Sequence, residues 1–162
     1  MILKLIANTR STSLKQRVNG LLNYIQNPEN TRTQNLSNYI RQPFASQPAW
    51  DEDALLEKCV YASSRNFLDD DPEQQKIEML QTASLNGRVE DPIVHLVASF
   101  KKFEVPTVEQ LEEQIDILAK HLGAEELQMQ YAMHLDTDNV HFHLIVNKVH
   151  PFKKNEHHEN KV

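Results

Sequence analysis

The sequence predicts an α+β fold in which an antiparallel sheet carries helices on one side. A short apolar run rich in β-branched residues at 94–100 is typical of a buried strand. Two further strand-like segments, 128–136 and 140–149, flank the short polar connection Thr137-Asp138-Asn139, which indicates a hairpin. We therefore expect these three segments to form the centre of the sheet.

The first third of the chain predicts a strand, a helix and a loop. Residues 2–7 are apolar except for Lys4 and predict an edge strand. Residues 14–26 carry apolar side chains three and four positions apart, which predicts a helix capped by Ser11 or Ser13. The stretch 28–48 is rich in Asn, Gln, Thr, Ser and Pro and predicts a long loop. The expected buried face of the helix consists of Val18, Leu21, Leu22 and Ile25.

Three more helices are expected before the hairpin. Two of them span 53–62 and 72–86, and in the second we expect Ile77 and Leu80 to face inward, with Ala83 or Ser84. The third begins at Pro106-Thr107, runs through residue 122 and ends at Gly123. Its apolar stripe consists of Val108, Leu111, Ile115, Leu118 and Leu122.

Length and composition fit a single folded domain spanning 1–162, with a polar tail at 152–162. Hydrophobic residues make up 40% of the chain, which excludes a disordered or low-complexity protein. The apolar stretches are too short to span a bilayer, and the N-terminus lacks the long apolar region of a signal peptide. The single cysteine, Cys59, cannot form an internal disulfide. We therefore expect a cytoplasmic protein.

Charge is distributed unevenly along the chain. Six basic residues against one acidic residue give residues 1–46 a net charge of +5, so the rest carries −11 of the total of −6. A basic segment attracts phosphates, although a solvated cationic surface has the same composition. The charge distribution is thus consistent with nucleic-acid binding and also with a solvated cationic surface.

Four residues of the predicted hairpin have the spacing of a metal site. His141 and His143 are two positions apart on one strand, so both point to the same face. His134 and Asp136 have the same spacing on the preceding strand. A His-x-His pair alone is more often packed or solvated, but a third histidine on the same patch favours Mn²⁺, Zn²⁺ or a similar ion. Asp136 could then orient one of the ligands.

The same residues resemble the third motif of plasmid mobilisation relaxases of the P type (MobA/VirD2-like), in the histidine-hydrophobe-histidine endonuclease superfamily. This resemblance covers His134–His143 and Val146–Pro151. The second motif of the same relaxases is similar to residues 91–100 together with Glu104, Pro106-Thr107 and Glu109-Gln110. A stretch that these relaxases carry between the first two motifs is matched by Ser64–Phe67, the acidic run that follows, and Glu78-Met79. Tyr24-Ile25, after a basic amphipathic helix, is a looser match to the first motif.

The resemblance implies a strand-specific DNA nickase with about five strands in its sheet. A tyrosine would attack a phosphodiester at an origin of transfer, leaving a 5′-phosphotyrosyl link and a free 3′-hydroxyl. It implies a divalent metal, Mn²⁺ or Mg²⁺ first and Zn²⁺ as the alternative. It also implies single-stranded DNA, a relaxosome accessory protein and a type IV secretion coupling protein as partners, and transfer of the protein with the DNA. Relaxases often continue into further domains, so the chain is expected to be the N-terminal part of a longer protein.

Tyr24 is the preferred nucleophile, because it follows the basic helix where the family's first motif places it. Tyr39 is the alternative. Tyr131 lies an odd number of positions from His134 and should face the other side of the sheet, and Tyr61 has only Arg65 as a basic neighbour.

Further residues complete the expected site. By the second motif, Ser99 would contact DNA near the scissile phosphate; Glu104 would support a histidine, unless it is a solvated loop carboxylate. Asn147 shares the histidine face and would hold the site or DNA, while Arg10, Lys15 and Arg17 are candidate phosphate contacts. His95 lies on the same strand face as Ser99, and its simplest interpretation is a histidine buried in the core.

Two alternatives to a nickase remain, because the match at 134–151 weighs against a third, a structural metal or interaction domain. A non-catalytic DNA-binding member of the same superfamily would keep the fold. A metal-dependent phosphodiester hydrolase would use the three histidines without a tyrosine.

Overall fold

The computed structural model describes residues 2–6, 13–26, 59–102, 104–135, 137 and 139–153. The predicted loop at 28–48, the first part of the predicted helix at 53–62, and most of the polar tail lie outside the described residues. Five strands form one antiparallel sheet in the order β1-β3-β5-β4-β2, as the fold class predicts. The strands are β1 (Ile2–Ile6), β2 (Cys59–Arg65), β3 (Ile93–Ser99), β4 (Met129–His134) and β5 (His141–Asn147). The helices are α1 (Leu14–Gln26), α3 (Pro72–Ser84) and α4 (Val108–Leu122).

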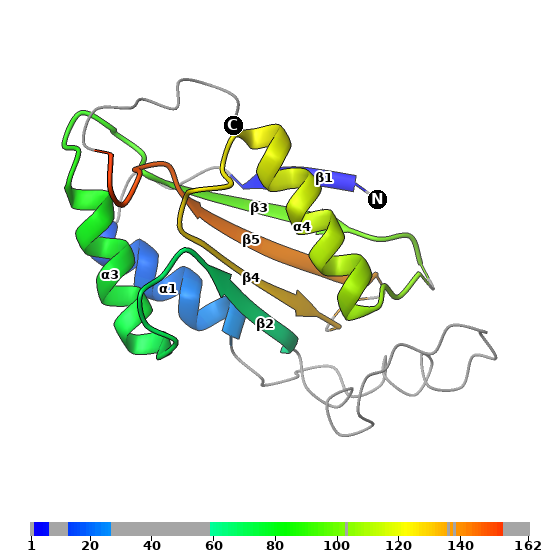
Figure 1. Cartoon of the computed structure of the whole chain (residues 1–162). Coiled ribbons are helices and arrows are strands. Elements are labelled where there is room, and N and C mark those ends of the chain that lie inside the picture. Colours follow the sequence, from blue (N-terminus) through cyan, green and yellow to red (C-terminus); the bar gives the residue numbers. More distant parts are fainter. Residues whose placement is uncertain are drawn as a thin grey trace.

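Helices cover both faces of the sheet, so the expectation of helices on one side is wrong. In Figure 1, α4 lies across the sheet on one side, whereas α1 and α3 lie together on the other. The side chains of β5 explain this arrangement. Phe142, Leu144 and Val146 belong to the core under α4, while Ile145 belongs to the core under α1 and α3. All seven residues of β5 are buried, so neither face of this strand is turned to solvent.

Helix α4 forms at the position that its sequence signals predict. Thr107 is the N-cap and exchanges hydrogen bonds with Gln110 in a capping box. Gly123 ends the helix with a φ of 65°, the left-handed conformation that glycine adopts without strain. Leu111, Ile115 and Ala119 are buried against the sheet. This face holds the larger of the two cores and positions no part of the histidine cluster.

Helix α1 matches its predicted bounds and buries Val18, Leu22 and Ile25. Ser13 caps it, because its Oγ accepts a hydrogen bond from the backbone N–H of Gln16. The helix is bound to α3 by polar contacts as well, since Lys76 Nζ donates to Asn23 Oδ1 at 2.7 Å. The edge-strand prediction for the first residues is also confirmed by β1.

Helix α3 forms as predicted, and its buried face matches the prediction in part, since Ala83 is buried and Leu80 packs against the core. Ile77 is 48% exposed, whereas Gln75 and Lys76 are buried. Gln75 Nε2 donates to Ser64 Oγ at 2.9 Å and its Oε1 accepts from Gln130. The apolar pattern was misleading because buried polar residues with hydrogen-bond partners occupy this face.

The predicted helix at 53–62 is wrong for its described part, because Cys59–Arg65 form strand β2. The strand pairs with β4, for example Ala62 with Ala132, and has an irregularity between Cys59 and Tyr61. Pairing along a whole neighbouring strand outweighs local helical periodicity. Within the described residues, no helix is both long and apolar enough to cross a membrane.

Candidate active site

Three histidines converge at one end of β4 and β5, as their spacing predicts. His134 and His141 are direct partners across the two strands, and His143 lies two positions further on the same face. One ring nitrogen from each of the three lies within 4.8 Å of the others. The ring centroids of His134 and His143 are 4.6 Å apart. These distances are short enough for three imidazoles to bind one metal ion.

Hydrogen bonds to carbonyl oxygens determine which ring nitrogen carries the proton in two of these histidines. Nε2 of His134 donates to the backbone carbonyl of Ile25 at 2.6 Å, because a carbonyl oxygen only accepts. Nδ1 of His141 likewise donates to the carbonyl of Asn139 at 3.1 Å. In a neutral imidazole the second nitrogen then carries the lone pair. The lone pairs that can bind a metal are therefore on Nδ1 of His134 and Nε2 of His141.

His143 contacts a fourth histidine, His95 of β3. Nε2 of His95 and Nδ1 of His143 are 2.8 Å apart, and the two rings stack with centroids 5.0 Å apart. Burial lowers the pKa of His95. Sequence reasoning assigned His95 no part in the site; the signal available was its position four residues before Ser99, on the same strand face.

The cluster fits a divalent cation by the chemistry of its donors. His134, His141 and His143 are all buried. Neutral imidazoles are good ligands for divalent cations. Nitrogen donors of this kind suit transition-metal ions better than Mg²⁺, which prefers oxygen ligands.

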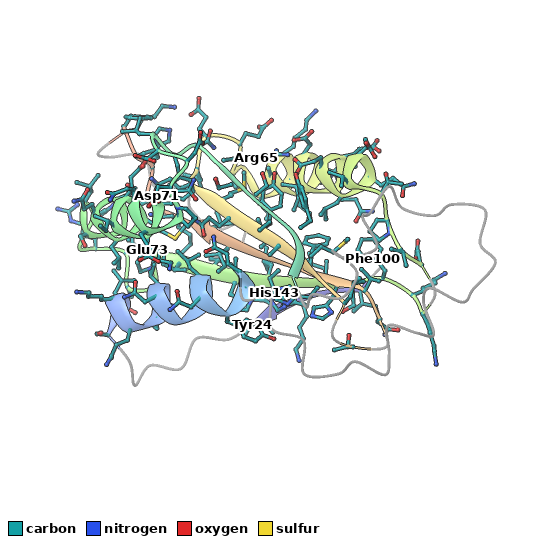
Figure 2. The ribbon with its side chains drawn as sticks, turned by 90° about the horizontal axis from the view of Figure 1, so that it is seen from below. Tyr24, Arg65, Asp71, Glu73, Phe100 and His143 are labelled. Carbon is teal, nitrogen blue, oxygen red and sulfur yellow. The ribbon has the colours of Figure 1, made fainter. Side chains whose placement is uncertain are left out.

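Tyr24 lies beside the cluster, in the last turn of α1. Its ring centroid is 5.3 Å from that of His143 and 5.7 Å from that of His134, and both contacts are edge-on. Figure 2 shows Tyr24 at the end of α1 next to His143, on the side of the sheet away from Arg65. Tyr24 is 45% exposed, so a substrate can reach it. The neighbouring residue Ile25 is the one whose carbonyl binds His134.

Two other tyrosines point to the opposite face, as predicted for Tyr131. The hydroxyls of Tyr61 and Tyr131 each donate to Glu112 of α4 at 2.8 Å. Burial, together with the hydrogen bond to Glu112, raises the pKa of Tyr61 to about 12, and burial also raises that of Tyr131. A raised pKa makes a phenol a poorer nucleophile at neutral pH. Tyr39 lies outside the described residues.

The structure describes the positions of Ser99, Lys15 and Glu104. Ser99 pairs directly with His141 in the register of β3 and β5, so both belong to the face that carries the cluster. Lys15 is exposed on α1. The side chain of Glu104 is exposed and accepts a hydrogen bond from the backbone N–H of Lys101 at 3.2 Å. Arg10 and Asp136 lie outside the described residues.

The side chains of Asn147 and Arg17 bind other residues of the fold and are largely buried. Asn147 has no exposed surface, and its Nδ2 donates to the carbonyl of Met79 while its Oδ1 accepts from Val149 N. A side chain without exposed surface cannot reach DNA in this conformation, so the expected DNA contact is corrected to a contact between α3 and the sheet. Arg17 forms an ion pair with Asp91 at 2.9 Å, and only 12% of its side chain is exposed.

A family model matches most of the chain, and individual proteins match up to half of it. The family model described as a relaxase, MobA/VirD2-like, nuclease domain matches residues 24–162. Protein MobA of Acidithiobacillus ferrooxidans is 45% identical over 64 residues, which cover 40% of this chain and 16% of that protein. Two proteins named TraI from Escherichia coli are 40% and 37% identical over 81 residues, which cover 49% of this chain and 11% of each relative. The aligned segments thus represent less than a fifth of these relatives.

Proposed function

The chain belongs to the relaxase family with a MobA/VirD2-like nuclease domain, and we propose that it nicks one DNA strand at a plasmid origin of transfer by attack of Tyr24. The proposal places it among P-type relaxases of the histidine-hydrophobe-histidine superfamily. The observation that carries it is the position of Tyr24, which is exposed and lies edge-on to two histidines of the cluster. An exposed tyrosine thereby lies next to the candidate cation site.

The proposed step is a transesterification at phosphorus. The phenolic oxygen of Tyr24 forms a bond to the scissile phosphorus, and the bond from phosphorus to the 3′-oxygen breaks. The phenolic proton goes to solvent or a nearby base, and the departing 3′-oxygen takes up a proton. A divalent cation at the histidines supplies charge neutralisation at the scissile phosphate. Water is not consumed, so the 5′-phosphotyrosyl link permits the strand to be rejoined.

Other residues of the chain are assigned roles around this step. Ser99, the strand partner of His141, contacts DNA close to the scissile phosphate. Lys15 on α1 and Arg10 bind backbone phosphates, and Asp136 orients a histidine. We keep Glu104 as a supporting carboxylate, although its described hydrogen bond is to Lys101. The partial exposure of Tyr24 fits a single strand that passes along the end of α1.

The proposed partners follow from this activity. The chain binds single-stranded DNA at the origin of transfer, and a relaxosome accessory protein exposes that strand. A type IV secretion coupling protein then receives the protein with its DNA from the cytoplasm. The aligned segments cover only 11–16% of the curated relatives, so these partners are proposed for the chain and are not taken from the relatives.

A covalent-adduct assay tests the proposed nicking reaction. Single-stranded oligonucleotides tiled across the DNA flanking the gene are incubated with the protein and Mn²⁺, and adducts are separated by denaturing electrophoresis. We expect a shifted protein band that is lost in Tyr24→Phe and in His141→Ala. Tyr61→Phe, a change on the opposite face of the sheet, is the matched control and should keep the band.

The other outcomes separate the alternatives. An adduct that survives Tyr24→Phe moves the nucleophile to another residue, with Tyr39 the first to test. Cleavage without any adduct indicates a metal-dependent phosphodiester hydrolase. DNA binding without cleavage on every oligonucleotide indicates a non-catalytic member of the family.

A further inference from the structure

His95 is a buried histidine whose only described side-chain hydrogen bond is to a member of the cluster. Its Nε2 lies 2.8 Å from Nδ1 of His143, and the two rings are inclined by 28°. His95 is 6% exposed. It is not among the three histidines whose nitrogens converge on one point. Its contact is therefore with the back of one ligand ring and not with the centre of the cluster.

The sheet register fixes this contact. In the pairing of β3 with β5, Val97 of β3 is the direct partner of His143, and His95 of β3 is the direct partner of Ile145. His95 and His143 are thus diagonal neighbours on one face, within reach of long side chains. On the other side of β3, His95 pairs with Ile6 of β1. His95 therefore lies on a central strand, between β1 and β5.

The 2.8 Å contact has two possible proton arrangements. In the first, Nδ1–H of His143 donates to Nε2 of His95, and the lone pair of His143 is on its own Nε2. In the second, Nε2–H of His95 donates, and a neutral His143 must carry its proton on Nε2. Nε2 of His143 is buried in the structure. A proton on this nitrogen blocks it from binding a cation.

We propose that His95 is a positioning residue that accepts the Nδ1–H of His143 and so keeps Nε2 of His143 available to the cation. A metal-binding histidine usually donates its other N–H to a carboxylate, a carbonyl or water. In this chain a second imidazole takes that place, and it holds the orientation of the ring as well as its tautomer. The inference rests on the proposed function only in taking the histidine cluster as the cation site.

Titration calorimetry with Mn²⁺ alone tests this role without DNA. His95→Leu removes the acceptor and retains an apolar side chain in a buried position, so we expect Mn²⁺ affinity to fall by about 10- to 100-fold. His95→Gln places an acceptor oxygen close to the position of Nε2, and we expect affinity within about threefold of wild type. His150→Gln is the matched control, because His150 is equally buried and contacts Glu126 instead of the cluster. It should bind Mn²⁺ as wild type does.

Nuclear magnetic resonance of the metal-free protein provides a second readout that does not depend on the His95→Leu variant folding. Two-bond proton–nitrogen correlations of the imidazoles report the tautomer of His143. We expect Nδ1–H in the wild type and in His95→Gln. Nε2–H in the wild type overturns the proposal, as does equal loss of affinity in His95→Leu and His95→Gln, or unchanged affinity in His95→Leu.

These results are independent of the nicking reaction. If the affinities follow the expected pattern and no adduct forms on DNA, the proposed function fails and the role of His95 stands. If adducts form and His95→Leu binds Mn²⁺ as wild type does, the role of His95 fails and the proposed function stands.

Discussion

Nε2 of His134 donates a 2.6 Å hydrogen bond to the carbonyl oxygen of Ile25, the residue that follows Tyr24. The end of α1 is thereby joined to the histidine cluster through the backbone. Because α1 and β4 are far apart in the sequence, this bond depends on the whole fold. It fixes the position of the tyrosine relative to the three imidazoles.

Two substitutions of His134 should separate its anchoring role from metal binding. His134→Gln keeps an N–H donor for the carbonyl of Ile25 but removes the ligand nitrogen, so we expect stability within about 1 kcal/mol of wild type and no Mn²⁺ binding. His134→Ala removes both and leaves a buried carbonyl unsatisfied, so we expect a loss of about 3 kcal/mol. Urea unfolding and calorimetry measure the two effects. Equal stability of both variants would contradict the anchoring role.

Lys15 and Arg17 should respond differently when each is replaced by methionine. Lys15 is exposed, so Lys15→Met should weaken single-stranded DNA binding and make the negative slope of log affinity against log salt concentration shallower by about 1. Arg17 is committed to Asp91, so Arg17→Met should lower the free energy of unfolding and leave that slope unchanged. Fluorescence anisotropy at several salt concentrations checks both. A reduced slope in Arg17→Met would return Arg17 to the DNA contacts.

Asn147→Ala should act on stability and not on DNA affinity. The side chain is fully buried and joins the carbonyl of Met79 on α3 to the backbone N–H of Val149. Its removal leaves two buried backbone groups without these bonds, and we expect a loss of about 2 to 3 kcal/mol. Chemical denaturation gives the stability, and anisotropy at a temperature well below the unfolding transition gives the affinity. Weaker DNA binding by a fully folded variant would contradict the structural assignment.

Glu112 predicts how stability changes with pH on the α4 face. Burial raises the pKa of this carboxyl, but hydrogen bonds from Arg65, Tyr131 and Tyr61 outweigh it, and the net pKa is lowered from 4.5. The unfolded chain therefore binds the proton first as pH falls, so the stabilising effect is full above about pH 5 and is lost below that value. The difference in unfolding temperature between wild type and Glu112→Gln should shrink between about pH 6 and pH 3. A difference that does not change with pH would show that the carboxylate charge has no part in it.

The sequence predicted the elements with strong local signals. The caps of α4 at Thr107 and Gly123, the hairpin and the convergence of its histidines all follow from short-range patterns. The prediction failed where distant pairing decides the structure. A helix was expected at 53–62, but its described part belongs to strand β2, which pairs with β4. Ile77 of α3 is exposed, whereas the polar residues Gln75 and Lys76 are buried.

In the candidate site too, local features could be predicted from the sequence and contacts between distant residues could not. Two histidines on one strand are a local feature, whereas the contact of His95 with His143 requires the register of β3 on β5. The structural roles of Arg17 and Asn147 also depend on residues more than 60 positions away. Charge and strand periodicity alone cannot separate such buried anchors from residues that contact DNA.

Peptide mapping of the DNA adduct tests the central claim most directly. Each of the four tyrosines lies in a different tryptic peptide, with Tyr24 in 18–32 and Tyr39 in 33–41. After adduct formation with Mn²⁺, digestion of the DNA with nuclease leaves a nucleotide mass on the attacking residue, which mass spectrometry locates. We predict that the added mass is on Tyr24 in peptide 18–32. The same mass on peptide 33–41, 59–65 or 121–148, or no modified peptide at all, would contradict the account.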